Sequence, residues 1–351
     1  MQDTKLQLLV NRLKRQLLSR VWVARIVILL GMAVALFIVI KLVSPYMGAF
    51  SSLFTPLTSQ LTHSSGRTNI IFLGIGGPGH EAPDLTDTII LASIKLDTGQ
   101  VSLLSIPRDI WVPSMRAKVN TAYHYGNLRR PEDGGLILAK SSVSEVTGQP
   151  VHYAAVLDFT AFVSAVDRLG GIDVEVLESF TDDHYPLPGR EEDDCGGQDP
   201  EYLCRYEAIT FTKGPTHMDG QLALKYARSR HSTADSEGTD YARSRRQVQV
   251  IKAIQTKVVF MAKYPRNWST LKAVYDSLSS SLVTDFPKDQ TITLTRLGLM
   301  ARKHDLATAA LSDPDTLYHP PVSPLYDNQW VLIPRDNNPQ IVFDFVAGLF
   351  K

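Results

Sequence analysis

The pattern of hydrophobic and polar positions changes twice along the chain. Residues 26–40 (IVILLGMAVALFIVI) contain no charged or strongly polar side chain, and their apolar neighbours extend the run to about the 20 residues that a membrane-spanning helix needs. Residues 44–68 then mix Ser, Thr, Pro and Gly without a sustained period, which is typical of a linker. From Asn69 onward, short apolar runs alternate with amphipathic stretches, so this part predicts an α/β domain.

Within this part, period-two or continuous apolar runs predict strands, and apolar residues spaced three or four apart predict helices. Strands are predicted at 69–75, 88–96, 101–106 and 172–176, and helices at 159–169 and 241–263. The second and third strands are joined by Asp97-Thr98-Gly99-Gln100, which favours a hairpin. Residues 178–205 are acidic and rich in Gly and Pro, so we expect a loop insertion there.

The charge around the long apolar run predicts its orientation. Residues 1–25 carry six Lys or Arg against one acid, a net charge of +5. A core helix seldom lacks polar residues for four turns, and a cleaved signal peptide has a shorter apolar segment. We therefore interpret 21–43 as an uncleaved transmembrane signal anchor, with a basic tail (1–20) in the cytoplasm. The chain is then a single-pass protein of the cell membrane whose α/β domain is extracytoplasmic.

Overall composition excludes several classes of protein. Lys plus Arg and Asp plus Glu are 36 each, so no broad basic field attracts nucleic acid. The only cysteines, Cys195 and Cys204, exclude a disulfide scaffold, a four-cysteine zinc site and most iron–sulfur clusters. A disulfide between them in an oxidising exterior and two free thiols are both open.

The first chemically suggestive motif is Ile-Pro-Arg-Asp at 106–109. Proline ends the preceding strand and places Arg108 at the edge of the sheet, where it is able to bind an anion. A surface ion pair between Arg108 and Asp109 is the simpler alternative.

A second motif pairs residues 225–231 (KYARSRH) with residues 240–247 (DYARSRRQ). Arg243, Arg246 and Gln247 lie at i, i+3 and i+4 near the start of a predicted helix, so they share one face close to the positive end of its dipole. Arginines at this spacing repel each other unless an anion joins them, and phosphate is such an anion. The alternatives are a solvated basic face or a nucleic-acid patch. Residues 26–351 have a net charge of −5 and lie outside the cytoplasm in our orientation, and both facts argue against nucleic acid as a partner.

The third motif is a glycine-rich turn at 74–80 (GIGGPGH) followed by residues 84–88 (DLTDT). Backbone N–H groups in such a turn can bind phosphate, although the spacing matches neither a dinucleotide fingerprint nor a P-loop. Asp87 stands at the start of the next strand, where a carboxylate beside a pyrophosphate is able to hold Mg²⁺; a turn or capping acid is the alternative. His80 and His124 lack further ligands at zinc-site spacing, and no motif indicates a covalent nucleophile.

Together these segments resemble the LytR-CpsA-Psr phosphotransferases of bacterial cell envelopes. The resemblance covers NIIFLGIG, DLTDTIILASI, VSLLSIPRDIWV with KVNTAYHYG, LDFTAFVSAVDRLGGIDVEV, and GQLALKYARSRH with DYARSRRQ, in that order across 69–263. It implies a three-layer α/β/α domain over 69–351 with a central mixed sheet and an apolar pocket for a polyisoprenyl chain. It also implies transfer of a glycopolymer from polyisoprenyl pyrophosphate to peptidoglycan through a phosphodiester, with Mg²⁺ assisting.

The residues that match the family motifs receive roles from the resemblance. By motif position, Asp87 would bind Mg²⁺, Arg108, Arg228 and Arg230 would be catalytic, and the pyrophosphate would contact Arg108, Arg228, Arg230, Arg243, Arg246 and Gln247. One departure is Gly76, which replaces an aspartate usual in the family, so that Glu81 or Asp84 is a possible substitute ligand. Two other functions stay open: a pyrophosphatase that uses water as the acceptor, and a non-catalytic lipid-phosphate-binding regulator of envelope assembly.

Overall fold

The computed structural model describes residues 55–78, 82–187, 189–190, 192–197, 199–232, 234, 237–287, 291–301, 304, 306–312 and 314–351. The predicted basic tail (1–20), the predicted membrane span (21–43) and the first part of the predicted linker (44–54 of 44–68) lie outside these residues. Among the helices of the described residues, none combines the length and the apolar character that crossing a bilayer requires.

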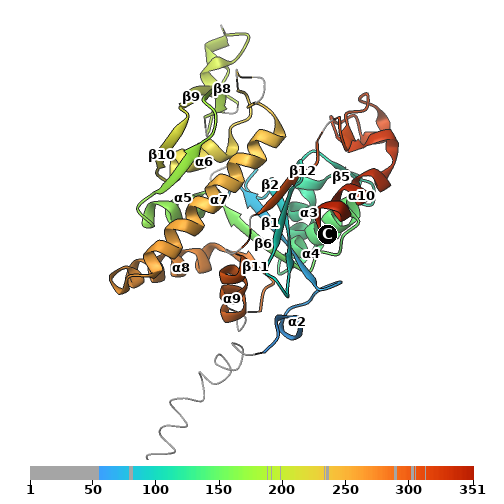
Figure 1. Ribbon diagram of the computed structural model, residues 1–351. Helices are drawn as coiled ribbons and strands as arrows, with labels where there is room; N and C mark the ends of the chain where they lie inside the picture. Colours follow the sequence, from blue (N-terminus) through green and yellow to red (C-terminus); the bar gives the residue numbers. More distant parts are fainter. Residues whose placement is uncertain are drawn as a thin grey trace, which may run out of the picture.

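A six-stranded mixed sheet forms the centre of the molecule (Figure 1). Its order is β11 (Val283–Thr284), β6 (Tyr153–Asp158), β1 (Arg67–Ile75), β2 (Thr86–Lys95), β3 (Val101–Ser105) and β12 (Ala307–Ala310). β1 runs parallel to β6 and antiparallel to β2, and β2 and β3 form the predicted hairpin, with Ile94 opposite Val101. The expected strands at 69–75, 88–96 and 101–106 are therefore confirmed.

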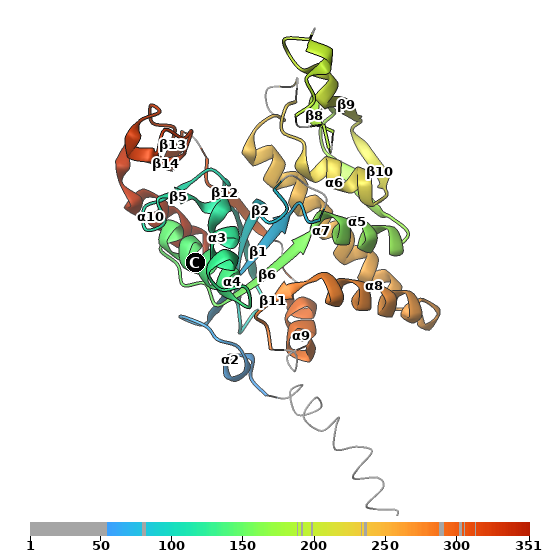
Figure 2. The ribbon, with the colours of Figure 1, turned by 180° about the vertical axis from the view of Figure 1, so that it is seen from behind.

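Helices cover both faces of this sheet, as Figures 1 and 2 show. One face packs on α3 (Ala122–Arg129), α4 (Gly134–Thr147) and α10 (Pro339–Leu349), with Ile71, Leu91 and Leu104 fully buried beneath them. The other face packs on α9 (Thr291–Ala301) through Leu297, and α7 (Asp240–Ala262) lies along β12. Successive strand residues face opposite sides of the sheet and both sides are covered, which gives the expected α/β arrangement with a central mixed sheet.

A second hydrophobic cluster joins α7 to a group of helices and two small antiparallel sheets. These elements are α5 (Phe159–Arg168), α6 (Gly220–Arg228), β7 (Ile172–Val176) with β10 (Gly214–Met218), and β8 (Phe180–Pro186) with β9 (Tyr206–Phe211). α8 (Trp268–Ser281) packs against α5. The shorter elements are α2 (Leu57–Gln60), β4 (Trp111–Val112) with β5 (Ala117–Lys118), and β13 (Leu317–Tyr318) with β14 (Ile333–Pro334).

Two expectations from the sequence need correction. The range 178–205, expected to be a loop, begins with strand β8, whose Phe180 and Tyr185 are buried in the second cluster; only the part after Pro186 is irregular. The end of the predicted linker is also ordered, because Leu57 and Leu61 pack beneath the sheet and β1 starts at Arg67. In both places a few buried apolar side chains outweigh a polar local composition.

Candidate functional site

The sheet brings the predicted chemical motifs to one edge. β6 runs parallel to β1, while β2 runs antiparallel to both β1 and β3. The ends of β1, β3 and β6 and the start of β2 therefore lie together. At this edge Gly74 pairs with Thr88 and Ile75 pairs with Thr86, so Asp87 is the extra residue of a β-bulge. Bulges next to functional sites commonly redirect one side chain out of the sheet.

Asp87 binds two of the predicted arginines. Its Oδ1 lies 2.5 Å from Nη1 of Arg108, and its Oδ2 lies 3.4 Å from Nη2 of Arg228. The exposed fractions of the Asp87, Arg108 and Arg228 side chains are 30%, 38% and 24%. We call these three residues the Asp87 cluster. It places two guanidinium groups on a single carboxylate within reach of solvent.

A second carboxylate supports Arg108. Asp109 Oδ2 lies 3.5 Å from Arg108 Nε, and Asp109 Oδ1 accepts a hydrogen bond of 2.8 Å from Lys118 Nζ. Burial alone would lower the pKa of Arg108, but the charges of Asp87 and Asp109 and their hydrogen bonds raise it above the ordinary value. Arg108 Nε is buried and faces the Asp109 carboxylate, so this nitrogen helps to hold the side chain in place. The Arg108–Asp109 ion pair, which the sequence offered as an alternative, therefore exists beside the Arg108–Asp87 pair and helps to position Arg108.

The residues around Arg228 form an aromatic base for its side chain. The Arg228 guanidinium carbon lies 4.3 Å from the centre of the Phe159 ring, a cation–π contact. A Cβ on Gly74 would lie 3.2 Å from the same ring, and one on Gly77, whose φ is +79°, would lie 2.8 Å from Asp158 Cβ. The glycines therefore permit close packing. The Gly77 N–H donates to the carbonyl of Pro83, so that group does not face a ligand.

Asp182, which the sequence reasoning missed, fixes the segment after α6. Its Oδ2 accepts hydrogen bonds from Ser229 Oγ (2.5 Å) and from the N–H groups of Arg230 (2.9 Å) and His231 (3.2 Å). Burial alone would raise the pKa of Asp182, but these bonds and one from the N–H of His184 lower it below its ordinary value. A buried carboxylate thus holds the backbone that carries Arg228 and Arg230. Its signal was hidden because 178–205 was interpreted as a loop.

Arg246 does not lie where the sequence prediction expects it. Its side chain is 1% exposed and forms a 2.9 Å ion pair with the buried Glu237. Its other donors bind the carbonyls of Tyr226, Ser229 and Glu237, at 3.1, 2.6 and 3.0 Å. Burial lowers the pKa of Arg246, and Glu237 opposes this effect. In this arrangement Arg246 is a buried brace for the Ser229 segment, because its guanidinium is occupied by protein acceptors.

The remaining predicted arginines and Gln247 lie nearby with different exposure. Arg230 is half-buried, whereas Arg243 and Gln247 are buried on the first turns of α7. Gln247 Oε1 has no hydrogen-bond partner within the described residues. Gln247 and Val248 line a gap between α7 and strands β2, β3 and β12. The gap has a free volume of about 10 Å³, which is room for little more than one water molecule.

A histidine–aspartate pair lies beside the Asp87 cluster. Nδ1 of His124, on α3, lies 2.8 and 2.9 Å from the two carboxylate oxygens of Asp84. Asn120 connects this helix to the site, since its N–H donates to the Arg108 carbonyl and its own carbonyl accepts from Thr86 Oγ1. The structure therefore pairs Asp84 with His124, and Glu81, the other possible substitute ligand, lies outside the described residues.

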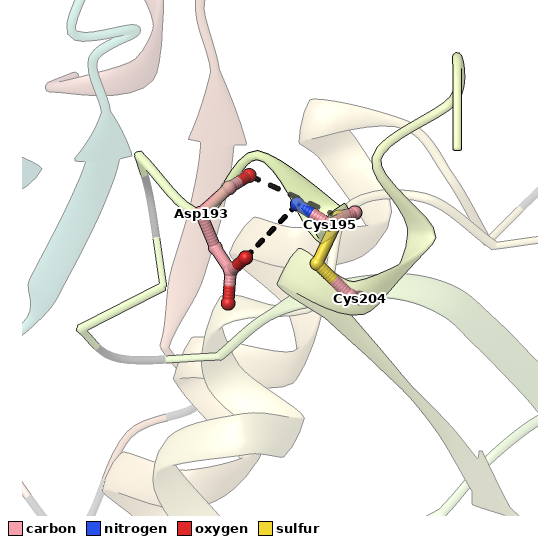
Figure 3. Close-up of side chains that lie close together, drawn as sticks. All are labelled: Asp193, Cys195 and Cys204. Carbon is pink, nitrogen blue, oxygen red and sulfur yellow. Dashed lines mark hydrogen bonds between the residues drawn. A yellow bond between two sulfur atoms is a disulfide. The ribbon is translucent and has the colours of Figure 1, made fainter. Parts of the chain in front are cut away.

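Candidate metal ligands are few. Within the described residues, Asp193, Cys195 and Cys204 form the only group of three whose ligand atoms lie close together (Figure 3). The two sulfurs form a disulfide, so they do not act as thiolate ligands; of the two states that the sequence left open, the structure contains the bridge. Asp87 offers a single carboxylate at the other site. One carboxylate fits Mg²⁺ when phosphate oxygens and water supply the other ligands, so the residues present suit a metal that arrives with a phosphorylated substrate.

Comparison with known proteins finds relatives that are named as teichoic acid transferases. The chain is 27% identical over 223 residues to the polyisoprenyl-teichoic acid–peptidoglycan teichoic acid transferase TagU of Enterococcus faecalis, covering 62% of each chain. It is 28% identical over 241 residues to the TagU of Oceanobacillus iheyensis, covering 67% of this chain and 64% of that one. The matched region thus spans less than two thirds of each relative.

Solved structures and a family model agree with these matches. The crystal structure of TagV from B. subtilis superposes with a TM-score of 0.52 at 22% identity, covering 82% of this chain and 98% of that one. This likeness supports the fold. The model of the LytR_cpsA_psr family matches residues 51–320, which include every motif described above. The chain therefore belongs to the LytR-CpsA-Psr family.

Proposed function

We propose that this protein transfers a glycopolymer from a polyisoprenyl pyrophosphate carrier to peptidoglycan and forms a phosphodiester. The observation that carries the proposal is the Asp87 cluster, in which Arg108 and Arg228 converge on one accessible carboxylate at the edge of the sheet. The names of the TagU relatives favour this substrate class. We further propose that the protein is anchored by residues 21–43 in the cell membrane, with its amino terminus in the cytoplasm and its catalytic domain outside.

The two arginines suit a pyrophosphate because it can replace their carboxylate partner. Arg108 and Arg228 each donate an N–H group to Asp87. When the donor binds, these groups neutralise its phosphate oxygens and the charge that develops in the transition state. A sugar hydroxyl of the acceptor attacks the sugar-linked phosphorus and forms a new P–O bond. The bond from this phosphorus to the bridging oxygen breaks, and polyisoprenyl phosphate leaves with that oxygen and takes up the proton of the hydroxyl.

Asp87 and His124 have separate parts in this proposal. Asp87, released from its arginines, would hold Mg²⁺ together with the pyrophosphate, and the ion would add to charge neutralisation there. Asp84 orients the His124 ring through Nδ1 and leaves Nε2 to bind a hydroxyl. Asp84 lies three residues before Asp87, so their Cα atoms are within about 11 Å of each other. His124 is thus close enough to assist in positioning the acceptor.

An exposed apolar part of the sheet is the basis for placing the polyisoprenyl chain of the donor. Phe72, in the middle of the central strand β1, is 45% exposed, although central strands normally have their apolar side chains covered. Its cross-strand neighbour Ile90 lines the gap beneath α7. We propose that the polyisoprenyl chain covers this apolar surface and that α7 moves away from the sheet to admit it.

A transfer assay with three outcomes tests the proposal. Purified full-length protein receives lipid-pyrophosphate-linked polymer and peptidoglycan, and the polymer is then assigned to wall-linked, free or lipid-linked fractions. Transfer gives wall-linked polymer; free polymer phosphate would indicate the pyrophosphatase, and unchanged donor would indicate a binding protein. Arg108→Ala should abolish most of the product. Arg168→Ala, which removes an exposed arginine on α5, is the matched control and should retain activity.

A further inference from the structure

An exposed aromatic and basic surface lies at the turn between α7 and α8, away from the Asp87 cluster. Phe260, Tyr264 and Trp268 are 53%, 42% and 60% exposed, and Lys263 and Arg266 between them are also exposed. We call these five residues the aromatic turn. Scattered exposed aromatics need no explanation, but a group of three within nine positions indicates an interaction surface.

The side chains of the aromatic turn are held in place despite their exposure. The Phe260 and Tyr264 rings meet edge to face with their centres 5.4 Å apart, and the Arg266 guanidinium lies 5.5 Å from the Tyr264 ring centre. Trp268 Nε1 donates a 3.1 Å hydrogen bond to the carbonyl of Ala262. The aromatic faces are therefore presented to solvent in a fixed arrangement, at a low entropy cost for binding.

The sequence on both sides of the turn is basic. From Tyr241 to Tyr275 the chain contains eight Lys or Arg and no Asp or Glu, and Lys257, Lys263 and Arg266 lie at the turn or within one or two helical turns of it; Lys272 on α8 is paired with Asp276. The sequence from 26 to 351 has a net charge of −5, so this basic stretch differs from its surroundings. Aromatic rings combined with Lys and Arg suit the interface of an anionic bilayer, where the rings lie at headgroup level and the cations bind phosphate.

The position of the turn agrees with a membrane partner. Figures 1 and 2 both place the α7–α8 turn in the lower half of the molecule, toward the end where α2 lies and away from the β8–β9 hairpin. The described chain begins at Thr55 just before α2, twelve positions after Val43, the end of the predicted span. Twelve residues reach at most about 40 Å. This end of the molecule therefore stays near the bilayer if 21–43 spans it.

We propose that the aromatic turn docks on the anionic outer surface of the membrane and so fixes the orientation of the domain over the bilayer. The proposal rests on the anchored arrangement given under the proposed function, but it assigns a second, peripheral contact with lipid to residues outside the pyrophosphate site. The turn inserts Phe260, Tyr264 and Trp268 at headgroup depth, while Lys263 and Arg266 bind lipid phosphates.

Quenching of tryptophan fluorescence by brominated lipid tests this contact in the full-length chain. The protein is reconstituted in phosphatidylglycerol nanodiscs that contain one copy each. All variants carry Trp22→Phe, because Trp22 lies in the predicted span. Trp330→Phe leaves Trp268 as the exposed reporter, and Trp268→Phe leaves Trp330, which is 48% exposed in the segment before β14. Trp111 is buried and common to both variants.

We expect the variant that retains Trp268 to lose much of its fluorescence in brominated discs, and the variant that retains Trp330 to keep its fluorescence. The quenching should decrease in neutral phosphatidylcholine discs and in a Lys263→Glu, Arg266→Glu variant. Equal fluorescence of Trp268 in brominated and ordinary discs would overturn the proposal. Equal quenching in anionic and neutral discs would overturn the role of the basic residues.

The transfer assay is run on the same discs to separate the two proposals. A quenched Trp268 without polymer transfer would leave the membrane contact standing and refute the proposed function. Polymer transfer without quenching of Trp268 would support the proposed function and refute the membrane contact of the aromatic turn. Failure of the chain to remain with the discs would refute the anchor on which both depend.

Discussion

The burial of Arg246 leads to a prediction that separates the structure from the family motif. By motif position Arg246 binds pyrophosphate, whereas the structure pairs it with Glu237, and both residues are almost inaccessible. The perturbation is Glu237→Gln, which removes one charge and nearly preserves the shape. Removing one partner of a buried ion pair costs about 3–5 kcal/mol, because the other charge is left uncompensated. Three carbonyls still accept hydrogen bonds from Arg246 in this variant. We therefore expect the lower end of this range, a decrease of about 3 kcal/mol in the free energy of unfolding.

The free energy of unfolding is measured by urea titration of the detergent-solubilised full-length protein, followed by tryptophan fluorescence. Arg246→Gln and the double variant complete a thermodynamic cycle, in which the double variant should cost less than the sum of the single ones. Lys272→Gln is the control, since its ion pair with Asp276 is exposed and such pairs contribute at most about 1 kcal/mol.

The reasoning is refuted if Glu237→Gln lowers the free energy of unfolding by less than about 1 kcal/mol, a loss no greater than that of an exposed pair. It is also refuted if Arg246→Gln weakens binding of the donor while leaving the stability unchanged. That second result would mean that Arg246 leaves its buried partners and contacts the pyrophosphate directly.

Further predictions concern the site and its supports. Arg108→Ala should slow transfer by roughly 30- to 1000-fold, the 2–4 kcal/mol of one preorganised charge contact, with little change in stability; wild-type turnover would contradict its role. Asp87→Asn should reduce the dependence of transfer on Mg²⁺, and wild-type activity that is indifferent to chelators would refute the metal. Asp182→Asn should lower the free energy of unfolding by about 1–3 kcal/mol at pH 7, because the backbone N–H groups lose a charged acceptor. Because the folded pKa of Asp182 lies below its unfolded value of 3.8, wild type should keep this advantage above pH 3.8 and lose it as the pH falls through the folded pKa; urea titrations at several pH values check this. Cys195→Ser with Cys204→Ser should remove roughly 2–3 kcal/mol from the closed loop, and should alter selection of the polymer more than the chemical step, while two reactive thiols in the unreduced, denatured wild type would show that no bridge forms.

The elements and the centre of the site could be predicted because their signals are local. Short apolar runs indicated β1, β2 and β3, and the proline after β3 indicated that Arg108 stands at a sheet edge. Asp87 was expected at the start of a strand, and the structure places it there, in contact with Arg108. The β-bulge that redirects Asp87 depends on the register between two strands, which hydrophobic patterning does not specify to one residue at a bulge.

The residues that hold the site in place, Arg246, Glu237 and Asp182, could not be predicted because their roles depend on tertiary contacts. Helical spacing indicated that Arg243, Arg246 and Gln247 share a face of α7, but not that this face points inward. The energetic cost of burying the Arg246 charge is offset by its ion pair with Glu237. Glu237 precedes the helix and belongs to none of the motifs found in the sequence. Asp182 escaped notice in a segment whose composition indicated a loop, although alternate residues of that segment are buried.

A structure of the protein with a polyisoprenyl pyrophosphate bound would test the central claim most directly. The account predicts that the two phosphates contact Arg108 and Arg228, that Asp87 separates from at least one of these arginines, and that Arg246 remains paired with Glu237. Pyrophosphate bound elsewhere, with both Asp87 ion pairs intact, would contradict the account.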